Sequence, residues 1–195
     1  MDLSNIPIIY VDFEGAMLPH PSVPRLMMEF STMALNRKLP SVQILERLHR
    51  RGAKFIFNAR TSDPVPQMTG RLHRLDGRPL PDPSKEYLQM INRVRFNPEM
   101  LLENVPLVIH HSKVPKGVSM AAISRKYGFS LENTAAIDNT LDEMEGYPLD
   151  RVVLTNPFIG INQQTYEAVA LKLDHLLLPV KRDPAEIPPR TPPQP

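Results

Sequence analysis

The chain has 195 residues, of which 42% are hydrophobic, and 23 basic against 21 acidic residues give it a formal net charge of +2. Such a chain is long enough for one globular domain with a sizeable core, and its balanced charge indicates no general affinity for nucleic acid. It has no cysteine, no apolar run that spans a bilayer and no signal-peptide pattern. This excludes disulfides and a cysteine nucleophile, and predicts a soluble cytoplasmic protein without membrane partners.

The first strong pattern along the chain is a strand that ends in acids. Apolar residues from Ile8 to Val11 favour a strand, and Asp12 and Glu14 follow it before Gly15, which permits a sharp turn. In an open parallel sheet, ligands bind outside the carboxyl ends of the strands. The two carboxylates are therefore expected where chemistry is usually done; the alternative is an edge strand that ends in solvated acids.

Four further strand patterns alternate with helical patterns. Strands are expected at residues 53–57, 105–109, 134–137 and 151–155. Helices are expected at residues 41–52, 87–94, 116–128 and 162–177, with Ser41 and Asn162 as N-caps. Residues 19–38 and 62–83 are predicted to be irregular insertions. The first is a surface helix or a small helical insertion over the site, and the second is a long loop or flap.

The last residues of the chain are rich in proline. The chain has 22 prolines, and seven of them fall within residues 179–195, where little is apolar enough to bury. We therefore expect a poorly ordered tail there and a folded domain over residues 1–178. The tail is a linker or a disordered end; the alternative is that residues 188–193 dock as a polyproline helix in an aromatic groove of a binding partner.

The alternation of strands and helices predicts a doubly wound, Rossmann-like α/β domain. About five strands joined by right-handed crossovers form a parallel sheet with helices on both faces. Neither GxGxxG nor GxxxxGK[ST] follows any predicted strand. The usual dinucleotide and P-loop sites therefore have no support in this sequence.

Polar residues suited to a phosphate and a divalent cation end four of the five strands. They are Asp12 and Glu14, residues 58–61, residues 110–116, and Asp138 with Asp142. Parallel order brings these strand ends to one edge of the sheet. Because hard cations prefer oxygen ligands, the cluster favours Mg²⁺ over zinc, and a lysine opposite the cation would neutralise a phosphate.

The order and spacing of these residues resemble the motifs of the haloacid dehalogenase (HAD) superfamily, whose members are mostly magnesium-dependent phosphatases. Residues 8–15 are similar to the first motif, hhhDxDG[TV], with glutamate at the second acid. Lys116 at a helix start and the Asp138-xxx-Asp142 pair are similar to the third and fourth motifs. The resemblance covers residues 6–178 and implies a HAD-like fold with no large cap domain. Residues 152–161 are more weakly similar to the HAD domain of Swiss Army Knife RNA repair proteins, which raises phosphorylated nucleic-acid ends as a substrate class.

The resemblance implies a role for each acid. Asp12 is the nucleophile that forms an aspartyl-phosphate, and Glu14 protonates the leaving oxygen and then activates water. The Mg²⁺ cofactor is held by Asp12, Asp138, Asp142 and Glu14, the last through its backbone carbonyl. The ordinary structural explanation of Asp142 is a helix cap.

The resemblance also implies which residues bind the phosphate. Asn58 stands where the superfamily has a serine or threonine that hydrogen-bonds the phosphoryl group, and Thr61 is the less favoured substitute. Lys116 pairs with the phosphate, and Lys113 is its alternative. Taken singly, Asn58 closes a turn, Lys116 is a surface lysine at a helix start, and His110 is a packed ring.

Three departures from the superfamily pattern bear on activity. Glu14 replaces an aspartate, although the enolase-phosphatase branch also carries glutamate there; Ala16 removes a hydroxyl that would brace the loop; and Asn58 is bulkier than serine. The leading hypothesis is a magnesium-dependent phosphomonoester hydrolase with an open site for a phosphoprotein or a nucleic-acid end. The alternative is a catalytically impaired HAD-like binding module.

Overall fold

The structure is a computed structural model that describes residues 3–13, 15–17, 39–61, 68–69, 73–74, 95–103, 105–111 and 114–179. The predicted insertion at residues 19–38, the predicted helix at residues 87–94 and the tail after residue 179 lie outside the described residues. The boundary between domain and tail therefore stays a prediction. None of the described helices is long and apolar enough to cross a membrane.

A single sheet runs through the described part of the chain, with seven strands in the order β4-β3-β5-β2-β1-β6-β7. The strands are β1 (Ile8–Asp12), β2 (Lys54–Thr61), β3 (Met68–Thr69), β4 (His73–Arg74), β5 (Leu107–His111), β6 (Thr134–Asp138) and β7 (Val152–Leu154). The five predicted strands correspond to β1, β2, β5, β6 and β7, and all of these pair in parallel. The short strands β3 and β4 fall in the predicted flap and add an antiparallel edge beside β5.

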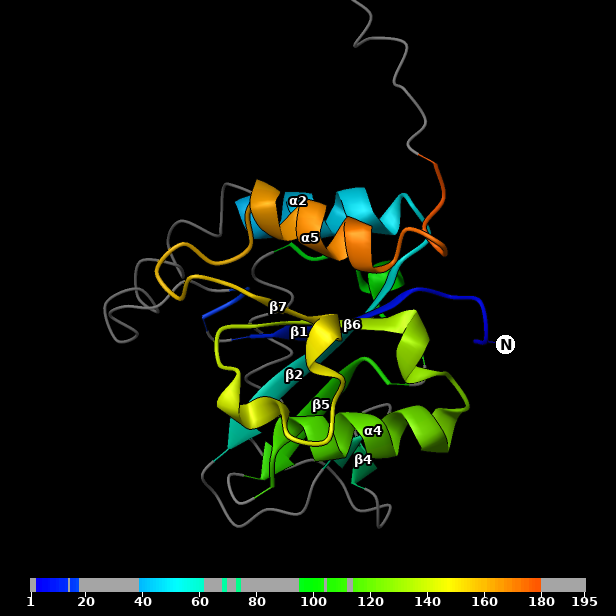
Figure 1. The fold of residues 1–195 in the computed structure, drawn as a ribbon, viewed down its shortest axis with the longest axis vertical. Coiled ribbons are helices and arrows are strands. Elements are labelled where there is room, and N and C mark those ends of the chain that lie inside the picture. The colour runs from blue at the N-terminus through cyan, green and yellow to red at the C-terminus, as the bar shows by residue number, and fades with distance from the viewer. Residues whose placement is uncertain are drawn as a thin grey trace, which may run out of the picture.

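Helices cover both faces of the sheet. The described helices are α2 (Pro40–His49), α4 (Lys116–Tyr127) and α5 (Gln163–Lys172), with short 3-10 helices η1 (Pro98–Met100), η2 (Leu131–Asn133), η3 (Asp142–Met144) and η4 (Leu149–Arg151). Figure 1 shows α2 and α5 side by side on one face and α4 on the opposite face. The predicted doubly wound α/β fold is confirmed.

Several predicted boundaries differ from the structure. Strand β2 continues through Thr61 because it pairs with β1 on one side and with β5 on the other, so residues 58–61 are not a turn. Ser41 does not cap α2: the helix begins at Pro40, whose ring fixes a helical φ, and Ser41 is buried inside it. Helix α5 ends at Lys172, although Leu173 and Leu177 beyond it remain buried in the core.

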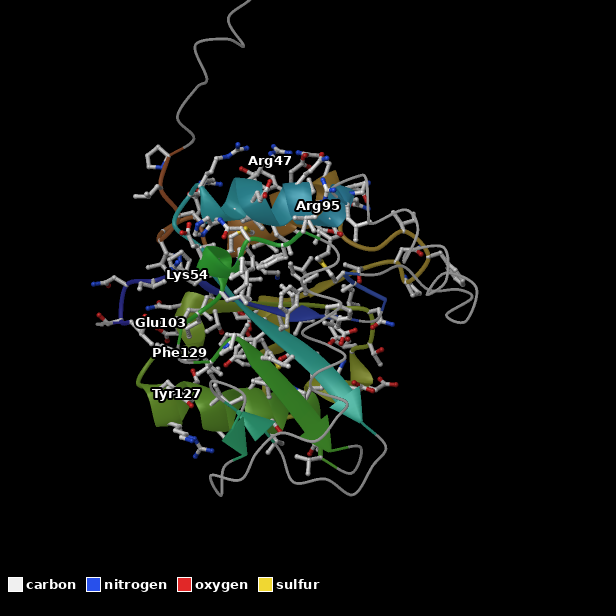
Figure 2. All side chains as sticks on the ribbon, turned by 180° about the vertical axis from the view of Figure 1, so that it is seen from behind. Arg47, Lys54, Arg95, Glu103, Tyr127 and Phe129 are labelled. Atoms are coloured by element: carbon white, nitrogen blue, oxygen red, sulfur yellow. The ribbon has the colours of Figure 1, made fainter. Side chains whose placement is uncertain are left out.

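The strands alternate their side chains between two apolar clusters, one on each face. The cluster under α2 and α5 includes Val11, Phe57 and Ile137, whereas the cluster under α4 includes Tyr10 and Ile56. Figure 2 shows that side chains fill the space between the sheet and the helices. Strands buried on both faces are what an enclosed parallel sheet requires.

The chain crosses the sheet in a way that singles out the end of β1. From β1 it runs to β2 and β5 on one side, and then returns to β6 on the other side of β1. Such a reversal leaves a crevice outside the carboxyl ends of the strands, which is where ligands bind in open α/β sheets. In Figure 2, Lys54, Glu103, Tyr127 and Phe129 mark the opposite, amino-terminal edge of the sheet.

Candidate active site

Four buried polar side chains lie on the α4 face at the carboxyl ends of four neighbouring strands. Asp12, Asn58, His110 and Asp138 are exposed by 4%, 1%, 0% and 0%. Each follows, two positions later, a core residue of the cluster under α4, so the strand alternation places all four on that face. Those core residues are Tyr10, Ile56, Val108 and Ala136. The arrangement follows directly from the two-residue period of the strands.

The ammonium of Lys116 joins the strand ends. Lys116 is the first residue of α4 and is only 4% exposed. Its Nζ lies 2.8 Å from Oδ1 of Asp12, 3.0 Å from Oδ2 of Asp138 and 3.0 Å from Oε2 of Glu143. One ammonium therefore faces three carboxylates.

Gly117 allows the start of α4 to approach this cluster. A Cβ at Gly117 would lie 2.5 Å from the carbonyl oxygen of Met144 and closer still to that of Glu145. No side chain fits there without moving backbone. The glycine that follows Lys116 in the motif is thus needed for the packing of α4 against η3, which brings Lys116 and Glu143 together.

The carboxylate of Asp138 is held at both oxygens. Its Oδ1 accepts a hydrogen bond from the backbone N–H of Thr140 at 2.9 Å, and its Oδ2 accepts one from Lys116. The backbone carbonyl of Asp138 accepts from the N–H of Thr155 at 2.8 Å. The bonds from Thr140 and Lys116 fix the side chain in the site, and the bond from Thr155 fixes its backbone.

Burial and mutual repulsion perturb the charges in the cluster. Burial and the charge of Asp138 raise the pKa of Asp12, Lys116 opposes both effects, and the net pKa is about 7. Burial also raises the pKa of Asp138 against the opposing effect of Lys116. For Lys116, burial lowers the pKa, but the attraction of Asp12 and Asp138 outweighs it and the net pKa is raised. The lysine therefore stays charged, and when all three carboxylates are ionised they carry more negative charge than it neutralises.

The loop after β1 is braced by the connections that follow β6 and β7. Gly15 adopts a φ of 86°, and a Cβ there would lie 2.5 Å from the side-chain nitrogen of Asn139. The carbonyl of Gly15 accepts from the hydroxyl of Thr155 at 3.3 Å, and that of Ala16 accepts from the N–H of Ile161 at 3.0 Å. These bonds brace the loop although Ala16 lacks a hydroxyl.

Asn58 lies beside the nucleophile candidate, within the strand rather than after it. It is in register with Asp12, and its backbone carbonyl accepts from the N–H of Phe13 at 3.1 Å. The side-chain Nδ2 lies 3.7 Å from the sulfur of Met120, and Oδ1 lies 3.4 Å from Nε2 of His110. Asn58 is therefore a buried neighbour of Asp12 with defined partners.

The remaining predicted site residues have different outcomes. Glu14 and Lys113 lie outside the described residues. Thr61 is the last residue of β2, where it pairs with His111, and its side chain is not described. Asp142 is exposed at the start of η3, and its assignment as a metal ligand stays a prediction.

Glu143, the residue after Asp142, is a site residue that the sequence pattern did not predict. Its side chain is 19% exposed and pairs with Lys116. In a 3-10 helix, consecutive residues point in directions about 120° apart, so adjacent acids cannot both face the site. The spacing of five positions from Asp138 to Glu143 was the available signal, but sequence alone does not say which acid turns inward.

The donor set of the site is compatible with Mg²⁺. Among the residues that the structure describes, no three His, Cys, Asp or Glu side chains form a ready metal cage. However, Mg²⁺ is usually bound through one or two carboxylates together with substrate phosphates and water. Asp12 and Asp138 supply two buried carboxylates, and the cluster has an excess of negative charge over Lys116. The residues therefore fit a magnesium ion that completes its shell with phosphate and water oxygens.

Comparison with known proteins supports the fold. No protein-family model and no curated protein matches the chain. A crystal structure described as a HAD-like phosphatase from Mesorhizobium loti matches with a TM-score of 0.50 and 8% identity, covering 91% of this chain and 90% of that one. A HAD family hydrolase from Streptomyces avermitilis MA-4680 gives a TM-score of 0.42 at 10% identity, covering 85% and 90%. By the first of these similarities, the chain has the HAD-like α/β fold that its motifs predict.

Proposed function

We propose that the protein is a magnesium-dependent phosphomonoester hydrolase that works through an aspartyl-phosphate on Asp12. The observation that carries this proposal is the ion-pair cluster in which Lys116 joins Asp12 to Asp138 at the strand ends of a HAD-like fold. A buried carboxylate beside a fixed cation, at the crevice of the sheet, suits attack on a phosphoryl group.

In the first step, a carboxylate oxygen of Asp12 attacks phosphorus, and the bond from phosphorus to the leaving oxygen breaks. Glu14, two residues further along the chain, gives the leaving oxygen its proton. In the second step, Glu14 takes a proton from water, which attacks the phosphorus of the aspartyl-phosphate. Inorganic phosphate leaves and Asp12 returns as a carboxylate.

The other residues of the site bind charge. Lys116 holds Asp12 in place and neutralises phosphoryl oxygens, while the amide of Asn58 donates a hydrogen bond to the same group. Mg²⁺, when bound by Asp12 and Asp138, would neutralise the phosphate and stabilise the in-line transition state. Asp142 and the backbone carbonyl of Glu14 belong to the proposed ligand set.

The proposed substrate is a phosphorylated macromolecule, either a phosphoprotein or a nucleic-acid end. This proposal rests on the short length of the chain between the predicted strands, which leaves no room for a large cap domain. An open site admits a large substrate more readily than a capped one does.

Hydrolysis of an aryl phosphate by wild type, Asp12→Asn and Asp174→Asn, with Mg²⁺ and then with chelator, tests the proposal. Asp174 is 80% exposed and far from the site in the fold, so it is a matched control for the same substitution. We expect turnover that needs Mg²⁺ and Asp12 but not Asp174. Turnover retained by Asp12→Asn contradicts the proposal, and silence of wild type towards aryl phosphates, phosphopeptides and 3′- and 5′-phosphorylated oligonucleotides favours the binding module.

A further inference from the structure

The proposed reaction assigns no role to His110, a buried imidazole one strand away from Asn58. His110 lies in β5, is 0% exposed and faces α4. Its Nε2 lies 3.4 Å from Oδ1 of Asn58, which is itself in register with Asp12. His110, Asn58 and Asp12 therefore lie on three neighbouring strands, with Asn58 between the imidazole and the nucleophile.

The partners of Asn58 fix which way its amide points. A thioether sulfur only accepts hydrogen bonds, so the group of Asn58 that faces Met120 is the NH₂. The oxygen then faces His110, and Nε2 of His110 must be the protonated nitrogen that donates to it. The imidazole thereby opposes a 180° rotation of the amide, which would exchange donors for an acceptor that repels phosphate.

We infer that His110 is a positioning residue of the phosphate site: its Nε2–H holds the Asn58 amide with the NH₂ group available to a phosphate on Asp12. The inference rests on the proposed function and extends it to a residue that does not touch the substrate. The distance of 3.4 Å from Nε2 to Oδ1 is long for a hydrogen bond between a ring nitrogen and an amide oxygen.

A matched pair of amide substitutions separates positioning from packing. Glutamine places its amide nitrogen near the position of the imidazole Nε2, whereas asparagine is one methylene shorter and does not reach it. His110→Gln is therefore expected to keep the contact with Asn58, and His110→Asn to lose it. His110→Leu fills the space without any donor. Thermal unfolding of each variant checks that it is folded.

The measurements are kcat and KM for the aryl phosphate and the dissociation constant of inorganic phosphate with Mg²⁺, the latter by calorimetry. We expect His110→Asn and His110→Leu to lose about tenfold in kcat/KM and to bind inorganic phosphate about three- to tenfold more weakly, and His110→Gln to stay within about threefold of wild type. In an Asn58→Ala background, His110→Leu is expected to have no further effect, because the amide that it positions is gone.

The outcomes distinguish this inference from the proposed function. If Asp12-dependent hydrolysis is present but His110→Asn and His110→Leu leave kcat/KM and phosphate affinity within about twofold, the inference is overturned and the hydrolase stands. If phosphate binding depends on His110 and Asn58 but no ester is hydrolysed, the inference stands and the hydrolase fails. A wild-type protein that neither binds phosphate nor hydrolyses esters overturns both.

Discussion

The Nζ atom of Lys116 lies 2.8 Å from Oδ1 of Asp12, although the two residues are 104 positions apart in the chain. Both side chains are nearly buried, at 5% and 6% exposed, and the same ammonium contacts Asp138 and Glu143. With all groups ionised, three negative charges meet one positive charge in a place with little water. The stability of this site should therefore depend on pH and on added cations.

Replacing Lys116 with an uncharged residue should destabilise the folded protein. Lys116→Met leaves three carboxylates without their cation, and we expect the free energy of unfolding to fall by about 3–5 kcal/mol at pH 8. The loss should be smaller at pH 5, where Asp12, whose pKa is about 7, is protonated and no longer adds a charge to the cluster. Urea unfolding at the two pH values measures this. Lys126→Met, at an exposed position of the same helix, is the control and should change stability little at either pH.

Neutralising the nucleophile should have the opposite effect on stability. The pKa of Asp12 is raised to about 7, so between about pH 4 and pH 7 the folded protein holds a proton that the unfolded chain has released. Stability from this group is thus present at low pH and is lost as pH rises through 7.

Asparagine at position 12 does not ionise, so the Asp12→Asn variant does not lose this stability as the pH rises. Lys116 keeps two carboxylate partners, Asp138 and Glu143. We expect the variant to be more stable than wild type at pH 8 without divalent cations, by about 1–3 kcal/mol. The difference should shrink towards pH 5 and when Mg²⁺ is added. A difference independent of pH would show that Asp12 does not carry the raised pKa.

Magnesium binding should release protons near neutral pH. Because Asp12 has a pKa of about 7 without metal, Mg²⁺ must displace its proton at pH 6 but has little proton to displace at pH 8. Calorimetric titration in two buffers of different ionisation enthalpy is expected to show close to one proton released at pH 6. Asp12→Asn should release fewer protons, because of the two proposed carboxylate ligands with a raised pKa only Asp138 remains. Equal proton release by both proteins would place the titrating group elsewhere.

Sequence patterns predicted the site best where the chain itself fixes the position of a residue. Asp12 and Asp138 are the last residues of apolar strands, and Lys116 begins a helix with a glycine that its packing demands, so their meeting follows from the fold. The alternation of strand and helix patterns also predicted correctly that helices cover both faces of the sheet. These features depend on local pattern and on the parallel order of the strands.

Predictions failed where tertiary contacts decide. Residues 58–61 are predicted to follow the second strand as a polar cluster, but pairing of Asn58 with β1 and of residues 58–61 with β5 extends the strand through them, and Asn58 is buried beside Asp12. Ser41 is predicted to be the N-cap, but the helix begins one residue earlier, at Pro40, and Ser41 is buried inside it. Propensity is a weak guide once neighbouring strands and core contacts compete with it.

Gly117 offers a prediction with an unusual sign. In an exposed helix, replacing glycine by alanine stabilises by about 1 kcal/mol. Here the added Cβ would meet the carbonyls of Met144 and Glu145, so we expect Gly117→Ala to destabilise the protein by about 1–3 kcal/mol and to lower turnover by displacing Lys116. Urea unfolding and aryl phosphate hydrolysis measure the two effects. A more stable and fully active variant would contradict the close packing of α4 on η3.

Glu143 and its neighbour Asp142 can be compared directly, because they are adjacent acids and only Glu143 contacts Lys116. Glu143 is 3.0 Å from the ammonium of Lys116, whereas Asp142 is exposed at the start of η3. If Glu143 holds Lys116 and Asp142 binds Mg²⁺ as proposed, Glu143→Gln should lower kcat/KM by about tenfold or more at every Mg²⁺ concentration, whereas the loss in Asp142→Asn should be relieved by high Mg²⁺. The measurement is aryl phosphate hydrolysis across a range of Mg²⁺ concentrations. A loss of less than about threefold in Asp142→Asn at every Mg²⁺ concentration would remove Asp142 from the proposed ligand set.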